Sequence, residues 1–125
     1  MNISGVWEGN LVNTENTLSV PTCMLLNDVN GQLTGQIYFR RSAALEYYGE
    51  LQGSTQATAS ASSNGTFIKN SSLIVYYPDR SSTRFTGNFD SNNRFQSQYS
   101  YLDGNGGTLT TGNTDLRRSS RSSCQ

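Results

Sequence analysis

Apolar and polar residues alternate along most of the chain with a period of two residues. Around the middle of the C-terminal half, Phe85, Gly87 and Phe89 occupy every second position, and polar residues lie between them. A period of two is typical of β-strands with one buried and one solvated face. No segment shows the helical period. The alternation predicts nine strands, over 4–13, 17–27, 32–40, 44–53, 55–62, 66–77, 82–89, 94–102 and 107–114.

A short motif, apolar-x-Gly-x-apolar, recurs on these predicted strands. It reads WEGNL at 7–11, LTGQI at 33–37, YYGEL at 47–51 and FTGNF at 85–89, and FQSQY at 95–99 has Ser in place of Gly. Gly on a buried face weakens an isolated strand, so a compensating role is needed. A small residue permits the sharp coiling that closes a sheet, or it leaves room for large neighbours in a narrow interior. The repeat therefore favours a closed, strongly coiled sheet.

The predicted connections are short. Asn30-Gly31 and Asn64-Gly65 are typical of hairpin turns, and short connections between neighbouring strands indicate an antiparallel meander. The sequence therefore predicts an all-β fold, a single antiparallel meander of eight to nine strands closed into a small barrel over residues 1–116. Residues 117–125 form a basic, Ser-rich C-terminal tail, either loose or as an extension of the last strand. A sandwich of two sheets is the alternative.

The first predicted strand opens with Gly5-Val6-Trp7. This G-x-W motif at the head of a meander resembles the calycin superfamily of lipocalins, fatty-acid-binding proteins and avidins. The resemblance implies an up-and-down barrel that Trp7 closes at one end. It also implies that an arginine of the last strand, Arg117 or Arg118, packs across the indole. Avidins line their biotin site with several tryptophans, and this chain has 1 Trp, so biotin is not the expected ligand.

Composition and charge narrow the function classes. Hydrophobic residues make up 34% and charged residues 14% of the 125 residues, and the formal net charge is zero. A neutral chain lacks the basic surface that nucleic acids require. No apolar run approaches the roughly 20 residues of a membrane-spanning helix. The N-terminal residues lack the features of a signal peptide, so we expect a cytoplasmic protein or a mature form without its leader.

Several chemistries are excluded by residue type. The chain has 0 His, which removes Ser-His-Asp and Cys-His constellations and histidine-bound metals. Cys23 and Cys124 are interpreted as a buried inert thiol and an exposed free thiol, with a disulfide that ties down the tail as the alternative. Glu46 and Glu50 flank Tyr48 on a face expected to be solvated. We therefore expect no catalytic residues, no metal and no cofactor.

The aromatic residues are the best candidates for a site. The alternation places ten of them inside the barrel: Trp7, Phe39, Tyr47, Phe67, Tyr77, Phe85, Phe89, Phe95, Tyr99 and Tyr101. They form either a solid core or the wall of a pocket, because eight strands leave an interior just wide enough for side chains or for one small ligand. If there is a pocket, the predicted ligand contacts are Trp7, Tyr47, Tyr77, Phe85, Tyr99 and Tyr101.

Three functions follow as hypotheses. The first is a barrel that binds a small apolar or aromatic ligand inside, with Arg40, Arg41, Arg84 and Arg94 either at its mouth or simply solvated. The second is an interaction module, an inhibitor or lectin-like protein, with a solid core and a polar binding surface. The third is a cyclase-type barrel enzyme. Outward-facing Tyr38, Tyr48 and Tyr76 would suit a homo-oligomer.

Overall fold

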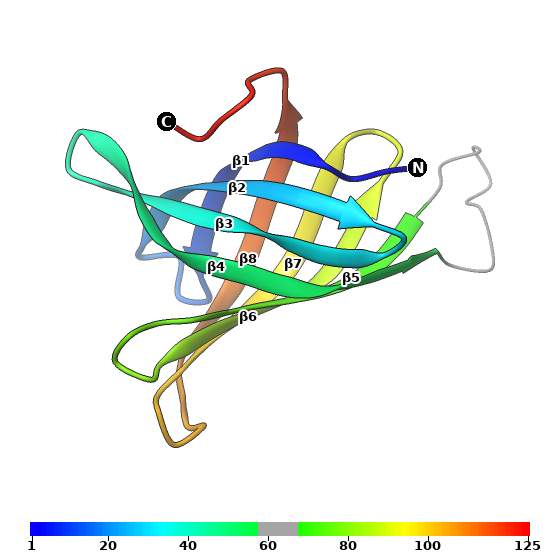
Figure 1. Cartoon of the computed structure of the whole chain (residues 1–125). Helices are drawn as coiled ribbons and strands as arrows, with labels where there is room; N and C mark the ends of the chain where they lie inside the picture. Colours follow the sequence, from blue (N-terminus) through cyan, green and yellow to red (C-terminus); the bar gives the residue numbers. More distant parts are fainter. Residues whose placement is uncertain (58–67) are drawn as a thin grey trace.

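The structure is a computed structural model that describes residues 1–57 and 68–125. Within these residues, eight antiparallel strands follow one another around a closed barrel in chain order (Figure 1). The predicted all-β meander is thus confirmed, and the two-sheet alternative is wrong. The strands are β1 (Gly5–Asn13), β2 (Ser19–Val29), β3 (Gln32–Arg41), β4 (Ala44–Ala57), β5 (Ile68–Tyr76), β6 (Ser82–Asp90), β7 (Arg94–Leu102) and β8 (Thr108–Ser119).

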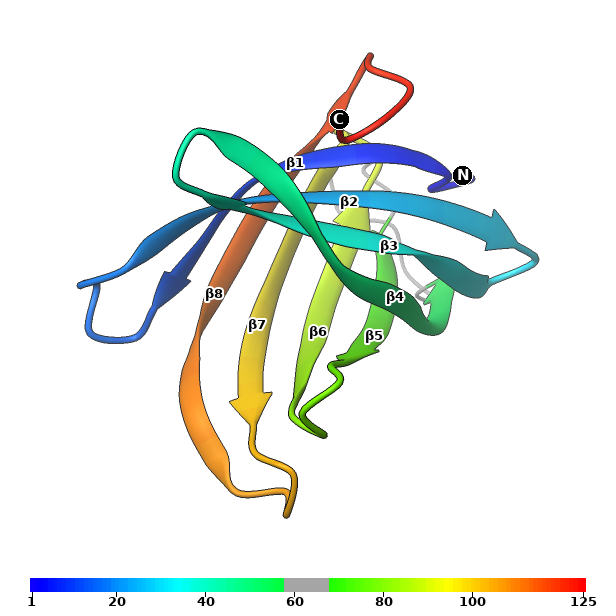
Figure 2. The ribbon, with the colours of Figure 1, turned by 60° about the vertical axis from the view of Figure 1, so that its left-hand side comes forward.

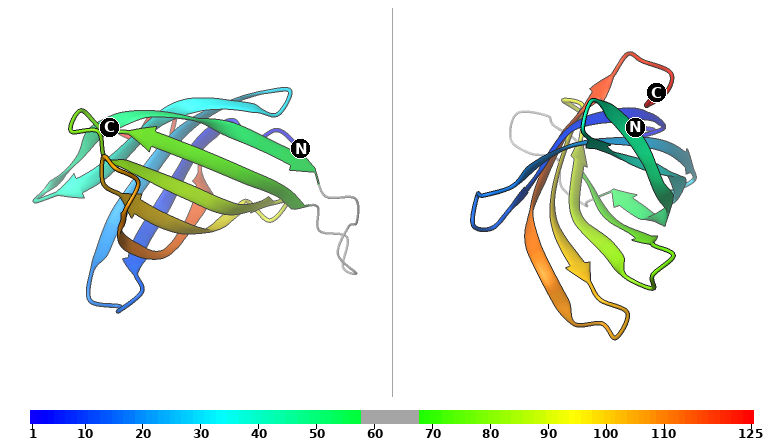
Figure 3. Two further views of the ribbon diagram at one scale, coloured as in Figure 1. Left: turned by 90° about the horizontal axis from the view of Figure 1, so that it is seen from below. Right: turned by 90° about the vertical axis from the view of Figure 1, so that its left-hand side faces the viewer.

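The two ends of the barrel differ. The connections β1–β2, β3–β4, β5–β6 and β7–β8 lie at one end, on the left and at the bottom of Figure 1, and the right panel of Figure 3 looks toward them. We call this the open end. The opposite, closed end carries residues 1–4 and the turns β2–β3 and β6–β7. Strands β1–β4 cross in front of β5–β8 at a steep angle in Figure 2, as expected for a strongly coiled barrel.

Some strand boundaries in the structure differ from those that the sequence predicts. The predicted strands 44–53 and 55–62 are one strand, β4, as far as Ala57. The rest of the second segment, the Asn64-Gly65 turn and Phe67 lie outside the described residues. Strand β8 continues to Ser119, so Arg117 and Arg118 belong to the barrel wall. In residues 1–57 and 68–125, no helix is long and apolar enough to span a membrane.

The repeated glycines lie where neighbouring strands approach most closely. A β-carbon at Gly9 would lie 1.9 Å from the carbonyl oxygen of Asp115, and one at Gly35 would lie 2.0 Å from that of Leu25. At Gly87 the nearest atom would be the carbonyl oxygen of Gln96, at 2.1 Å. Backbone atoms cannot move aside as a flexible side chain can. The close approach of the neighbouring strand therefore requires glycine at these three positions. Gly49 differs, because a β-carbon there would meet the Val75 side chain at 2.7 Å, so this glycine leaves room for a larger neighbour.

The closed half of the interior is solid. Phe89 stacks on Phe95 with 4.1 Å between ring centroids, and Trp7 and Phe89 meet edge-to-face with 4.8 Å between centroids. Offset and edge-to-face arrangements of this kind are favourable beyond their buried area. The same core cluster contains further buried apolar side chains, namely Ile3 before β1 and, on the strands, Met24, Leu33, Ile37, Leu51, Leu73, Phe85 and Leu116.

Trp7 and Arg118 form a lid over this solid half. The indole N–H of Trp7 donates a hydrogen bond to the carbonyl oxygen of Ile3 at 2.9 Å. The Arg118 guanidinium lies 4.6 Å from the Trp7 ring centroid, a cation–π distance. The same guanidinium donates to the carbonyl oxygens of Ser4 at 2.6 Å and Asn2 at 2.9 Å. Of the two arginines that the calycin resemblance suggested, Arg118 takes the position across the tryptophan.

The N-terminal segment is fixed over the closed end by a buried carboxylate. Asp28 accepts hydrogen bonds from the backbone N–H groups of Ile3 at 3.1 Å and Gly31 at 3.0 Å. The Lys69 ammonium group lies 3.8 Å from the same carboxylate. These partners satisfy an anion that would be costly to bury alone. The closed end is therefore sealed by polar contacts as well as by packing.

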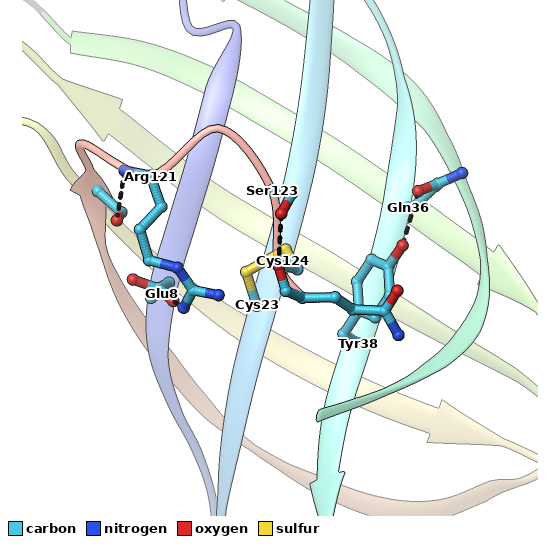
Figure 4. Close-up of a disulfide and its surroundings, with 9 residues drawn as sticks. Glu8, Cys23, Gln36, Tyr38, Arg121, Ser123 and Cys124 are labelled. Carbon is cyan, nitrogen blue, oxygen red and sulfur yellow. Dashed lines mark hydrogen bonds and ion pairs between the residues drawn. A yellow bond between two sulfur atoms is a disulfide. The ribbon is translucent and has the colours of Figure 1, made fainter. Parts of the chain in front are cut away.

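The C-terminal tail is attached to the outside of the barrel, and the expectation of two free thiols is wrong. Cys23 and Cys124 form a disulfide, with 5.8 Å between their Cα atoms (Figure 4). Cys23 faces outward on β2, and the tail covers it together with Val6 and Tyr38, which is 8% exposed instead of solvated as expected. A small apolar cluster outside the barrel brings the two cysteines together, and strand alternation does not reveal it.

Removing this disulfide should destabilise the barrel, because the crosslink closes a chain segment of 101 residues. We expect the Cys23→Ala/Cys124→Ala double variant to lose about 2–5 kcal/mol of unfolding free energy, measured by urea denaturation. Dithiothreitol should lower the stability of the wild-type protein to that of the variant and leave the variant itself unchanged. Equal stability of the oxidised protein and the variant would show that the tail contributes nothing.

Replacing Gly9 should strain the β1–β8 pairing. We expect Gly9→Ala to lower the unfolding free energy by about 1–3 kcal/mol or more, because the new methyl group overlaps the Asp115 carbonyl. Asn10→Ala, on the outer face of the same strand, is the matched control and should change stability by less than about 0.5 kcal/mol. If both variants unfold at the same urea concentration, the close approach of the strands is not what requires glycine.

Candidate functional site

A cavity of about 630 Å³ occupies the open half of the barrel interior. This volume lies within the range that small-molecule sites occupy in proteins. Its lining comes from every strand except β5 and from the β1–β2 and β5–β6 connections. The lining residues are Leu11, Leu18, Val20, Phe39, Arg40, Arg41, Tyr47, Tyr48, Tyr77, Pro78, Asp79, Ser81, Thr83, Tyr99, Tyr101 and Thr110.

One wall of the cavity is a row of four aromatic rings. Phe39 meets Tyr48 at 5.1 Å, Tyr48 meets Tyr77 at 6.3 Å, and Tyr77 meets Tyr101 at 6.2 Å between ring centroids. All three contacts are edge-to-face, the geometry that aromatic pairs prefer. Because each ring fixes the next, the wall is formed before any ligand arrives. A largely preformed wall of this kind reduces the ordering cost of binding.

A β-bulge places Tyr48 in this wall, contrary to the expectation for that strand. Ile37 pairs with Gly49, but the next residue, Tyr38, pairs with Tyr47, so that Tyr48 is the extra residue. The inserted residue reverses the alternation of β4 at its open end. Tyr47, expected inside, lies at the outer rim with 49% of its side chain exposed, and Tyr48, expected outside, faces the interior. Alternation counted from sequence alone cannot locate such an insertion.

The hydroxyl groups of the wall have different partners. The Tyr77 hydroxyl lies 2.8 Å from that of Thr83, and the Tyr101 hydroxyl donates to Ser81 at 3.3 Å. Tyr99 is only 3% exposed, yet its hydroxyl has no hydrogen-bond partner within the part of the chain that the structure describes. This oxygen is enclosed by protein, so Tyr99 contributes its ring and no accessible polar atom to the cavity wall.

Burial governs the protonation of these phenols. Burial raises the pKa of Tyr77 to about 12, and the hydrogen bond to Thr83 offsets the effect only in part. Burial, with a smaller contribution from the charge of Glu15, also raises the pKa of Tyr99. At the rim, hydrogen bonds from the Ser81 side chain and backbone lower the pKa of Asp79, so that this carboxylate stays ionised. Near neutral pH the inner wall is uncharged.

The four arginines considered for a mouth separate into two groups. Arg40 and Arg41 line the cavity, and both are exposed. Arg84 lies on the exposed outer face of β6. Arg94 pairs with Asp115 on the outer surface, at 2.7 Å and 3.1 Å for its two hydrogen bonds. Of these four arginines, only Arg40 and Arg41 are placed to contact a ligand in the cavity.

The structure brings together four of the six predicted ligand contacts. Tyr47, Tyr77, Tyr99 and Tyr101 line the cavity. Trp7 and Phe85 are fully buried in the core and do not line it. Sequence reasoning left out Tyr48, Phe39, Leu18 and Val20 as contacts, although Phe39 was expected inside the barrel. Leu18 and Val20 precede the strongly apolar part of β2, and only the closed geometry shows that they face the cavity mouth.

A second hollow lies outside the barrel wall beside the aromatic row. Pairing between β4 and β5 begins at Leu51 and Val75, so the first half of β4 pairs with β3 alone. The outer hollow is lined in part by Thr34, Glu50 and Gln52 and shares four residues with the cavity, namely Tyr47, Tyr48, Tyr77 and Pro78. Tyr48 and Tyr77 of the aromatic row therefore line both the cavity and this outer hollow.

The described residues offer little for acid–base or metal chemistry at this site. They contain no group of three or more His, Cys, Asp or Glu side chains placed to hold a metal ion. Asp79 is the carboxylate on the cavity lining, and it is exposed and hydrogen-bonded to Ser81. Comparison of the sequence with protein-family models and with curated proteins gave no match. The geometry of the cavity is thus the basis for the functional argument.

The raised pKa of Tyr77 predicts a loss of stability in alkali. The unfolded chain releases this proton near pH 10 and the folded protein near 12, so the folded state holds more protons in that window and stability falls as the pH rises through it. We expect Tyr77→Phe to lose less stability than the wild type between pH 9 and 11, by roughly 1–2 kcal/mol in urea denaturation. Parallel losses in both proteins would contradict this role for Tyr77.

Proposed function

We propose that the protein binds a small, largely apolar or aromatic molecule in the cavity at the open end of the barrel. The observation that supports this function is the contrast between the two halves of one interior. The closed half is filled by Trp7, Phe89 and Phe95, whereas the open half keeps about 630 Å³ behind a preformed aromatic wall. A barrel that served only as a scaffold would be expected to fill both halves, since cavities cost stability.

The cavity favours this function over the two alternatives considered. An interaction module acting through its surface has no need of an internal cavity with edge-to-face aromatic walls. A cyclase-type enzyme would share the aromatic wall, but it would also have to act on charge developing in the substrate. The groups that line the inner wall are apolar side chains and neutral hydroxyls. Binding without chemistry is therefore the function that we propose.

We also infer that the protein is a calycin-like barrel. Support comes from the eight-stranded meander, from Trp7 at the head of β1, and from Arg118 of the last strand across the indole. These three features are those that the sequence resemblance implied. The Cys23–Cys124 disulfide also supports the proposal that the protein functions in an oxidising compartment, where such crosslinks persist.

Filling the cavity should abolish binding. Thr110 lines the cavity from β8, so Thr110→Trp places a large ring in the space that a ligand needs. We expect the wild type to bind the neutral fluorescent probe N-phenylnaphthylamine at one site, and Thr110→Trp to weaken binding at least about tenfold, which corresponds to about 1.4 kcal/mol.

Leu109→Trp is the matched control for this experiment. Leu109 is adjacent on the same strand but 56% exposed, so its replacement adds the same ring outside the cavity and should leave probe affinity unchanged. Equal weakening in the two variants, or no saturable binding by the wild type, would contradict the proposal. Circular dichroism of each variant shows whether the barrel is intact.

A further inference from the structure

The outer hollow beside the aromatic row differs in composition from the cavity. Its volume is about 670 Å³, and four tyrosines line it, namely Tyr47, Tyr48, Tyr76 and Tyr77. Among the residues that the structure describes, Glu50 is the only charged residue on this lining. The hollow therefore combines aromatic rings with one carboxylate, whereas the cavity lining carries two arginines as well as Asp79.

The β-bulge in β4 puts a tyrosine and the carboxylate on the same face. On β3, Tyr38 and Gln36 both lie on the outer face, joined by a hydrogen bond of 2.9 Å (Figure 4). Their partners on β4 are Tyr47 and Glu50. Residues three apart on a regular strand face opposite sides, so these two share the outer face only because Tyr48 is inserted between them. The Tyr47 hydroxyl donates a hydrogen bond to the Glu50 carboxylate at 3.0 Å.

Tyr76 reaches the same place from β5. The β4–β5 ladder ends at the pair Leu51 and Val75, so Glu50 and Tyr76 are the next residues on the two strands. Both are exposed, Tyr76 to 58%. The hollow thus begins where the strands separate, with a carboxylate on one side and an accessible aromatic ring on the other.

The charge of Glu50 is available to a ligand. In the part of the chain that the structure describes, Glu50 has no ion pair with a lysine or arginine, unlike Glu8, Asp28 and Asp115. Arg84 lies on the outer face of β6 and does not line the hollow. Burial, together with the hydrogen bond and the charge of Glu50, raises the pKa of Tyr47, so that this phenol stays a neutral donor.

We propose that the outer hollow binds an organic cation, such as a quaternary ammonium group, which lies against Glu50 and the exposed rings of Tyr47 and Tyr76. The negative face of an aromatic ring attracts a cation, as the carboxylate does. An anion would be repelled by Glu50, with no basic residue on the described lining to offset the repulsion. This second binding site does not depend on whether the cavity binds an apolar ligand.

Choline and its neutral isostere neohexyl alcohol, which has carbon in place of the ammonium nitrogen, test the proposal. NMR titration of the disulfide-intact protein gives both affinities. We expect choline to bind about tenfold more tightly, because only choline carries the charge. The backbone amide signals of Glu50 and Tyr76 should shift saturably. Equal affinity of the two compounds, or no binding of choline, would overturn the proposal.

Matched variants assign the charge preference to Glu50. Glu50→Gln removes the charge but keeps an acceptor for the Tyr47 hydroxyl, and should weaken choline binding about threefold or more. Glu46→Gln removes the same charge from an exposed residue of β4 that does not line the hollow, and should leave choline affinity unchanged. Equal losses in the two variants would show a general charge effect instead of a site.

Tyr76 and the cavity provide two further controls. Tyr76→Leu should weaken choline binding and Tyr76→Phe should retain it, because the ring and not the hydroxyl attracts the cation. Wild-type affinity in Tyr76→Leu would contradict this role. Thr110→Trp fills the cavity and not the hollow, so choline affinity should stay unchanged. Loss of choline binding in Thr110→Trp would place the cation inside the barrel and overturn the inference.

Discussion

Pairing of β1 with β8 turns an open sheet into a barrel without free edges. The two strands approach so closely that β-carbons at Gly9 and Gly112 would overlap carbonyl oxygens of the neighbouring strand, at 1.9 Å and 2.1 Å. The same pairing places Trp7 opposite Arg118 and so forms the lid of the closed end. The tail leaves from the end of β8, within reach of Cys23 (Figure 4).

The barrel interior has a filled half and an open half, and the size and placement of the side chains determine the difference. At the closed end, Trp7, Phe89 and Phe95 fill the cross-section. At the open end the aromatic rings lie along one wall, because the bulge in β4 turns Tyr48 inward. Small residues on β8, such as Gly112 and Thr110, leave space in the interior. The cavity therefore results from where the aromatic side chains lie, and the solid half of the interior closes its inner end.

Most of the fold could be predicted from the sequence, and less of the site could. Period-two alternation and the repeated glycines predicted a closed antiparallel meander, since both are local signals of strand geometry. The features that were missed depend on contacts between distant residues. A bulge exchanged Tyr47 with Tyr48, and an apolar cluster outside the barrel joined Cys23 to Cys124 across 101 residues. Which buried hydroxyls of the described residues lack a partner, those of Ser97, Tyr99 and Thr114, likewise depends on neighbours that only the folded chain supplies.

The proposed function requires that one half of the interior admits a ligand and the other does not, and NMR titration with N-phenylnaphthylamine distinguishes the two halves. The chain has 1 Trp, whose indole N–H signal reports on the closed end alone. Methyl groups of Leu11, Leu18 and Val20 line the cavity and report on the open half. Binding in the open half should shift these methyl signals saturably while the Trp7 indole signal stays in place. Shifts centred on Trp7, or confined to residues on the outer face, would contradict it.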